Sequence, residues 1–201
     1  MFSKTQRFSI LLLCIVVNGC QRDSDTSNVS SSGSSNEVSQ SQSPTNQVIN
    51  SLWENPIELC SALRDDGLAS TGWQASDGEW YSDSNYQDIG ASGGRVPANL
   101  SFAVFGTSEN RAVKVQLVLN VNNPDTRQLG LDRLAAVTKE LLRKFGVELS
   151  ATLESSIKRG ESFSQEDVKM RLALKIEQTK VEIFVIELSD SSQPPRHFEF
   201  E

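Results

Sequence analysis

Histidine and cysteine are scarce in this 201-residue chain, which has one histidine, His197, and three cysteines. Most transition-metal sites in proteins take their ligands from these two residue types. Two of the cysteines, Cys14 and Cys20, lie in the first 20 residues, so only Cys60 remains in the body of the chain. The sequence therefore predicts no metal site and no cofactor.

Basic residues are also outnumbered by acidic residues. The chain has 19 Lys and Arg residues against 26 Asp and Glu residues, a formal net charge of −7. A protein that neutralises phosphates needs a basic surface. The nearest candidate is a group of basic residues on one expected helix: Arg133, Lys139, Arg143 and Lys144. Asp132 and Glu140 interrupt this group, so it is better interpreted as a solvated helix face. We expect no nucleic acid partner.

Long apolar runs are missing as well. The longest, residues 8–17, would rise about 15 Å as a helix, roughly half of the hydrocarbon thickness of a bilayer. It follows Lys4 and Arg7 and is followed by Gly19. A positive start, a short apolar run and a small residue are the three parts of an export signal. Residues 1–19 are therefore predicted to be a signal peptide.

The end of this signal reads Val17-Asn18-Gly19-Cys20. A branched aliphatic, a variable residue, a small residue and a cysteine, in that order, resemble the lipobox of bacterial lipoproteins. The resemblance implies cleavage between Gly19 and Cys20 and lipidation of the Cys20 sulfur. Gln21 stands where such lipoproteins carry an aspartate for inner-membrane retention, which favours the outer membrane, with the domain facing the periplasm. The alternative is an ordinary signal peptide that happens to precede a cysteine.

Removal of residues 1–19 would take the formal net charge to −9, because Lys4 and Arg7 leave with them. If Cys20 is acylated, Cys60 has no partner for an intrachain disulfide. Cys60 lies on the apolar side of an expected helix, and free cysteines are among the most buried residues. Three interpretations of Cys60 stay open: packing in the core, an intermolecular disulfide, and a reactive thiol.

Residues 20–51 are rich in serine and poor in apolar side chains. Such a stretch buries too little apolar surface to offset the entropy of ordering its backbone. We expect a disordered, lipid-anchored tether with a reach of about 30 Å. Residues 52–190 are expected to form one domain, and residues 191–201 a flexible tail.

The folded part is predicted to be α+β. A helix is expected over 56–66, with Asn55 as N-cap and Gly67 after its end, followed by a small hairpin turning at Asp77-Gly78. Residues 82–98 are expected to be a loop. Alternation predicts strands at 99–106, 111–121, 168–176 and 181–188, and apolar stripes predict helices at 131–145 and 151–159. The result is an antiparallel sheet of about four main strands in two hairpins, with the helices on one face, in the order α-(ββ)-ββ-αα-ββ.

Catalytic motifs are weak. Residues 90–94 fit G-x-S-x-G around Ser92, but no strand precedes them and the histidine is far away in the chain. Ser155 and Lys158 have the spacing of a serine–lysine pair without its companion motifs. The acidic residues Asp83 and Asp88 do not complete a calcium loop, because Asp88 occupies the glycine position. We expect a protein that is not an enzyme.

The aromatic residues are unevenly distributed. Trp73, Trp80, Tyr81 and Tyr86 lie close together in sequence, beside an acidic and glycine-rich stretch. Amphipathic rings of this kind can form a ligand-binding surface. The alternative is that Trp73 and Trp80 face each other in the small hairpin and pack on the first helix.

These features favour a membrane-anchored envelope module that binds or assembles with another envelope protein. The alternatives are a glycan- or peptidoglycan-binding module that uses the aromatic cluster, and an enzyme whose site has no sequence signature.

Overall fold

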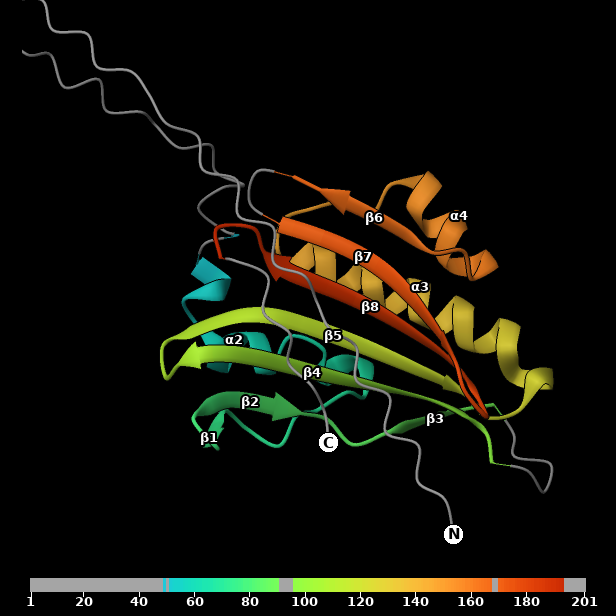
Figure 1. The fold of residues 1–201 in the computed structure, drawn as a ribbon, viewed down its shortest axis with the longest axis horizontal. Coiled ribbons are helices and arrows are strands. Elements are labelled where there is room, and N and C mark those ends of the chain that lie inside the picture. Colours follow the sequence, from blue (N-terminus) through green and yellow to red (C-terminus); the bar gives the residue numbers. More distant parts are fainter. Residues whose placement is uncertain (1–48, 50, 91–95, 168–169, 194–201) are drawn as a thin grey trace, which may run out of the picture. The chain divides into compact units, whose positions relative to one another are not determined.

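The structure is a computed structural model that describes residues 49, 51–90, 96–167 and 170–193 (Figure 1). Its strands are β1 (Gln74–Ser76), β2 (Glu79–Asp83), β3 (Gln87–Ile89), β4 (Ala98–Ser108), β5 (Arg111–Val121), β6 (Phe163–Glu166), β7 (Met170–Gln178) and β8 (Glu182–Asp190). Its helices are α2 (Pro56–Cys60), α3 (Arg127–Lys144) and α4 (Ala151–Arg159), with short 3₁₀ turns at Arg64–Asp66 and Pro124–Thr126; residues 49 and 51–53 are also helical.

Several features expected from the sequence lie outside the described residues. They are the signal peptide with Gly19, the lipidation site Cys20, residues 20–48 and 50 of the tether, Ser92, Val168, and residues 194–201 with His197.

All eight described strands join one antiparallel sheet. Its order is β1-β2-β4-β5-β8-β7-β6, and β3 pairs with β4 beyond the end of β2. The expected α+β class with an antiparallel sheet is confirmed, but the expectation of about four main strands is wrong. The short strands β3 and β6 lack apolar alternation and join the sheet through backbone hydrogen bonds to longer neighbours.

Two long hairpins form the centre of the sheet. β4 pairs with β5, β7 pairs with β8, and the hairpins meet where β5 pairs with β8. Alternate residues of β5, from Val115 to Val121, point to the buried side, and the register sets Leu117 between Phe102 and Ile186. Side chains on one face of a strand repeat every two residues, so this register brings the apolar faces of all four strands together.

α2 and α3 cover this apolar face and lie behind the sheet in Figure 1, and α4 packs on α3. α3 begins four residues earlier than expected, and the seven residues predicted for its apolar face are all buried: Leu131, Leu134, Ala135, Thr138, Leu141, Leu142 and Phe145. Gly130 lets α3 approach closely, because a Cβ there would lie 3.0 Å from the Leu119 side chain. α4 spans the predicted residues, with Ser150 as N-cap and Gly160 in the left-handed conformation.

The first expected helix is shorter than predicted. Asn55 caps α2 as expected, but α2 ends at Cys60 and is followed by turns and the 3₁₀ segment Arg64–Asp66. The Ser61 hydroxyl donates to the Ile57 carbonyl, a bond that competes with continuation of a helix. Ile57, expected in the apolar stripe, is 71% exposed, while Leu59 and Leu63 are buried.

The core extends to the N-terminal side of the expected domain boundary. Ile49 belongs to the stretch predicted as tether, yet it is buried in the core with Leu52 and Trp53. The Trp53 ring lies 4.8 Å from that of Phe145, centroid to centroid. The folded unit therefore includes at least one residue of the expected tether.

An arginine connects the two ends of the described domain. Arg111, at the start of β5, is 3.1 Å from the Glu54 carboxylate and 2.5 Å from that of Asp190, where β8 ends. Asp190 is buried and also accepts hydrogen bonds from the amide and hydroxyl of Ser192. These contacts fix both the entry and the exit of the chain at one end of the sheet.

Candidate binding face of the sheet

The face of the sheet that points away from α2, α3 and α4 is called the open face below. Its side chains come from the alternate strand residues that do not enter the core, and cross-strand register arranges them in rows. One row contains Tyr81, Phe105, Lys114, Ser189 and Arg171; the next contains Asp83, Ala103, Gln116, Glu187 and Ala173; a third contains Ser101, Val118, Val185 and Lys175. No described helix lies on this face (Figure 1).

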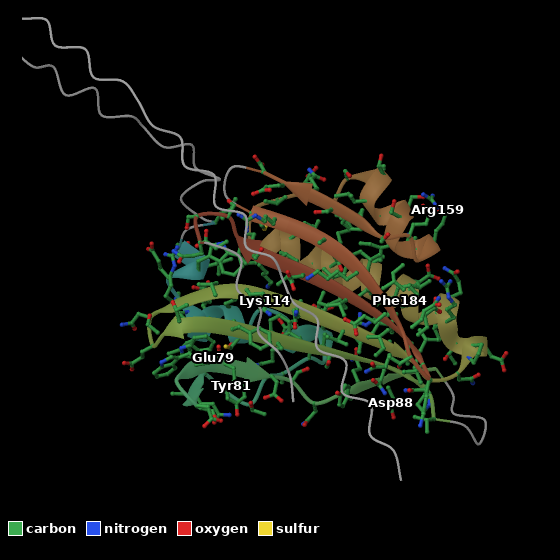
Figure 2. All side chains as sticks on the ribbon, in the orientation of Figure 1. Glu79, Tyr81, Asp88, Lys114, Arg159 and Phe184 are labelled. Atoms are coloured by element: carbon green, nitrogen blue, oxygen red, sulfur yellow. The ribbon has the colours of Figure 1, made fainter. Side chains whose placement is uncertain are left out.

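Lys114 stands near the middle of the open face. Its ammonium group lies 4.4 Å from the centroid of the Phe105 ring, within the range of a cation–π interaction. Lys114 and Phe105 are each only 5% exposed, although the helices are on the other side of the sheet. Figure 2 labels Lys114 on the sheet, and Glu79 and Tyr81 toward its β2 side.

A second charged group lies beside Lys114. Glu187 accepts hydrogen bonds from Gln116 Nε2 at 3.0 Å and from Lys175 Nζ at 3.1 Å. Burial by itself would raise the pKa of Glu187, but these two hydrogen bonds and the charges of Lys175 and Lys114 hold its pKa below the usual range. Glu187 is therefore a stable anion at the centre of the face.

Burial has the largest effect on Lys114. It lowers the pKa of Lys114 from 10.5 to about 8, with Lys175 acting in the same direction and Glu187 and Glu79 opposing it. The open face thus holds a lysine that loses part of its charge at mildly alkaline pH.

The pH dependence of the free energy of unfolding should reveal the titration of Lys114. Between about pH 8 and 10.5, Lys114 is largely neutral in the folded state and protonated in the unfolded state. The unfolded state then binds more protons, so the contribution of Lys114 to the free energy of unfolding rises with pH across this window. Relative to a Lys114→Met variant, the natural protein should gain about 2–3 kcal/mol between pH 7.5 and 10.5 in urea titrations. A difference that stays constant with pH would contradict the prediction.

The aromatic residues singled out from the sequence do not form one surface. Trp73 and Trp80 stack, with ring centroids 5.9 Å apart, and the Trp73 indole donates to the Glu109 carbonyl at 2.8 Å. Trp73 also packs against the hydrophobic core. Tyr81 points to the open face, opposite to its neighbour Trp80 in β2, and Tyr86 is 65% exposed in the turn after β2. The tryptophan pair therefore stabilises the hairpin, which turns at Asp77-Gly78 as predicted.

The remaining candidate side chains have structural roles. Cys60 is buried, as the core interpretation predicted. Burial raises the pKa of its thiol above the usual value, while hydrogen bonds with Ser82 and Ser70 oppose this effect.

The expected serine–lysine pair does not form. The Lys158 ammonium lies 2.6 Å from the Glu154 carboxylate, and the Ser155 hydroxyl accepts a hydrogen bond from Arg159. In the part of the chain that the structure describes, no three His, Cys, Asp or Glu side chains are placed to hold a metal ion.

A hollow of about 240 Å³ lies after the C-terminal end of α3. It is lined by Lys139, Arg143, Val147, Glu148 and Leu149. Arg143 is largely exposed and pairs with Glu140 at 2.6 Å on its own helix. The hollow has no buried polar group that would position a ligand.

The open face thus brings aromatic, aliphatic and charged side chains together on the side of the antiparallel sheet that faces away from the described helices. The model of a family of unknown function (DUF6030) matches residues 22–199, and the chain belongs to this family. No curated protein and no solved structure matches the chain. Within the described ranges, none of the helices is both long and apolar enough to cross a membrane.

Proposed function

We propose that the chain is a lipid-anchored envelope lipoprotein whose domain binds another envelope protein through the open face and performs no catalysis. The observation that supports this most directly is the composition of the open face. It combines an aromatic ring, aliphatic side chains and both signs of charge on one continuous surface.

The mixture of side chains on this face supports a protein interface. Phe105, Val118 and Val185 come from the adjacent strands β4, β5 and β8, and the charged groups of Lys114 and Glu187 lie between them. Asp83 in β2 and Lys175 in β7 add charge toward the sides. Aromatic and aliphatic side chains supply contact area in protein interfaces, and charged groups select the partner and its orientation.

Membrane attachment is proposed from the sequence Val17-Asn18-Gly19-Cys20. Two or more acyl chains on Cys20 would hold the protein at the membrane, because each buried CH₂ contributes about 0.8 kcal/mol. Residues 21–48 would then separate the domain from the lipid surface, with Gln21 favouring the outer membrane.

The anchor is tested by the change Cys20→Ser. The variant should lose incorporation of labelled palmitate and move from the membrane fraction to the soluble periplasmic fraction, because no acylated residue remains. A Cys60→Ser variant serves as the control and should stay in the membrane fraction. Retention of the Cys20→Ser protein at the membrane would exclude the proposed anchor.

Partner binding is tested by photo-crosslinking in intact cells. A photoreactive amino acid is placed on the open face at Ser101 or Ala173, which are half-buried, and as controls at the exposed positions Asp65 and Glu161. The open-face positions should give a discrete crosslinked species that the control positions do not give. Equal crosslinking from all four positions, or none from the open face, would exclude this face as the binding site.

A further inference from the structure

The two flanks of the open face carry charges of opposite sign. On β2, Glu79 and Asp83 lie on this face on either side of Tyr81, because alternate residues of a strand share a face, and both are exposed. On β7, Arg171 and Lys175 lie on the same face. In the sheet order β2 and β7 are each two places from β5, on opposite sides of it (Figure 1). The open face therefore has an acidic flank and a basic flank with β5 midway between them.

This charge distribution fits a second copy of the chain in one orientation. When two identical sheets pack with their strands aligned, the two-fold axis between them runs either along the strands or across them. An axis along β5 sets β2 of each copy against β7 of the other, so that Asp83 faces Arg171 and Lys175. An axis across the strands sets β2 against β2 and brings like charges together, which is unfavourable.

The axis along β5 also matches large side chains with small ones. It sets β4 of each copy against β8 of the other, and the open-face residues of these strands lie in the same three rows. The small residue and the larger residue that oppose each other in each row are Ser101 and Val185, Ala103 and Glu187, and Ser189 and Phe105. Facing positions that differ in size allow two sheets to interdigitate at their usual separation of about 10 Å. The open face is thus complementary to itself in side-chain size as well as in charge.

The residues of β5 would lie on the axis and face their own copies. Val118 would meet Val118 in an apolar contact, and Gln116 would meet Gln116 through its amide. Lys114 would meet Lys114, but Glu187 lies in the neighbouring row on the adjacent strand β8. Two lysines and two glutamates would therefore share the centre of the interface, and their formal charges cancel.

The same axis suits attachment of both copies to one membrane. Glu54, close to the point where the chain enters the domain, contacts Arg111 at the start of β5. Rotation about an axis along the strands leaves this end of β5 at the same end of the dimer in both copies. Both chains would then enter the dimer at one end, as anchors in a shared membrane require. An axis across the strands would put the two entry points at opposite ends.

We propose that two copies of this chain pack open face to open face about a two-fold axis along β5, with Asp83 of each copy between Arg171 and Lys175 of the other. This inference rests on the proposed function, in which the open face is the binding face, and it identifies the partner as a second copy.

Cysteine crosslinking in intact cells tests the position of the axis. Val118→Cys cells are treated with a short bismaleimide; the natural chain is the control, because Cys60 is buried and Cys20 is acylated in the proposed anchor. Val118 faces its own copy, so this single substitution should give a species of twice the monomer mass. Asp83→Cys or Ala173→Cys by itself should give none, because four strand spacings, about 19 Å, separate each residue from its own copy. Co-expression of these two variants should give the species.

Two results would overturn the proposed dimer. They are a dimer from Asp83→Cys by itself, and no dimer from Val118→Cys in a protein whose circular dichroism is native. Failure of the dimer is distinguishable from failure of the proposed function. If photo-crosslinking from Ser101 and Ala173 still gives a discrete species that contains a different protein, the open face remains the binding face and the second copy is the wrong partner.

Charge reversal tests the contact between the flanks. Asp83→Lys should lower the yield of the Val118→Cys dimer at least fivefold, because it opposes a lysine to Arg171 and Lys175. Adding Lys175→Glu to the same chain restores opposite charges at both contacts and should recover at least half of the yield. Asp65→Lys makes the same charge change at an exposed position outside the sheet and should leave the yield unchanged. Equal losses with Asp83→Lys and Asp65→Lys, or no recovery in the folded double variant, would overturn the proposal.

Discussion

Replacing Trp53 by alanine is expected to lower the free energy of unfolding by about 3–5 kcal/mol, as for other large buried aromatic residues. Trp53 is 1% exposed and packs on Phe145, so the truncation leaves a cavity between the N-terminal residues of the domain and the end of α3. Urea denaturation should show a lower midpoint with a similar slope.

A second substitution at Trp53 separates the effect of lost side-chain volume from the effect of the buried indole N–H group. The Trp53 indole nitrogen is buried and has no hydrogen-bond partner among the described residues. Trp53→Phe removes that unpaired donor while keeping most of the ring, so its cost should be only about 1 kcal/mol. Ile57→Ala is the matched control, since Ile57 is 71% exposed and its loss should change stability by less than about 0.5 kcal/mol. A cost for Trp53→Ala as small as that of the control would contradict the placement of Trp53 in the core.

The second large effect is expected at Gly106 in β4. A Cβ at this position would overlap the backbone oxygen of Arg111 and lie 2.6 Å from the Trp73 ring. The backbone oxygen cannot move without disturbing the β4–β5 pairing, where the register already shifts on both sides of Gly106. Gly106→Ala should therefore destabilise the protein by about 2–4 kcal/mol.

The same variant has a spectroscopic readout. Displacement of Trp73 should weaken its stacking on Trp80, which near-ultraviolet circular dichroism detects. Thr107→Ala, one residue further and exposed, is the control and should alter neither stability nor spectrum appreciably. An unchanged spectrum and stability in Gly106→Ala would show that the tryptophan does not pack on this glycine.

The two long hairpins and α3 and α4 could be predicted from the sequence because their local patterns agree with their tertiary surroundings. Val115, Leu117 and Leu119 alternate as residues of a half-buried strand must, and they are all buried. In α3, the spacing of Leu131, Leu134 and Leu141 gives one apolar face, and that face meets the sheet.

The short elements could not be predicted, because their positions depend on partners remote in sequence. β6 reads Phe-Ser-Gln-Glu and has no alternation, so its place at the sheet edge is set by pairing with β7. β3 lies within a polar stretch expected to be a loop and pairs with β4. The first helix was expected to continue to residue 66 because Gly67 is a typical residue after a helix end. Gly67 does take the left-handed conformation, but it ends the 3₁₀ segment Arg64–Asp66 instead of a continuous helix.

The open face was missed for a similar reason. Lys114 and Gln116 occupy the polar side of β5 in the sequence pattern, where lysine and glutamine are ordinary solvent-facing residues. Glu187 joins them only because β5 pairs with β8, about 70 residues further along the chain. The sequence instead indicated a binding surface at Trp73 and Trp80, but these two rings stack on each other.

The contact of Arg111 with Glu54 and Asp190 has a mechanical consequence. If Cys20 anchors the protein as proposed, tension enters the domain on the N-terminal side of Glu54, and the Arg111 guanidinium joins that entry to the start of β5 and the end of β8. Loosening of this contact under load would therefore act on the two central strands and leave the pairing of the edge strands β1 and β6 unchanged.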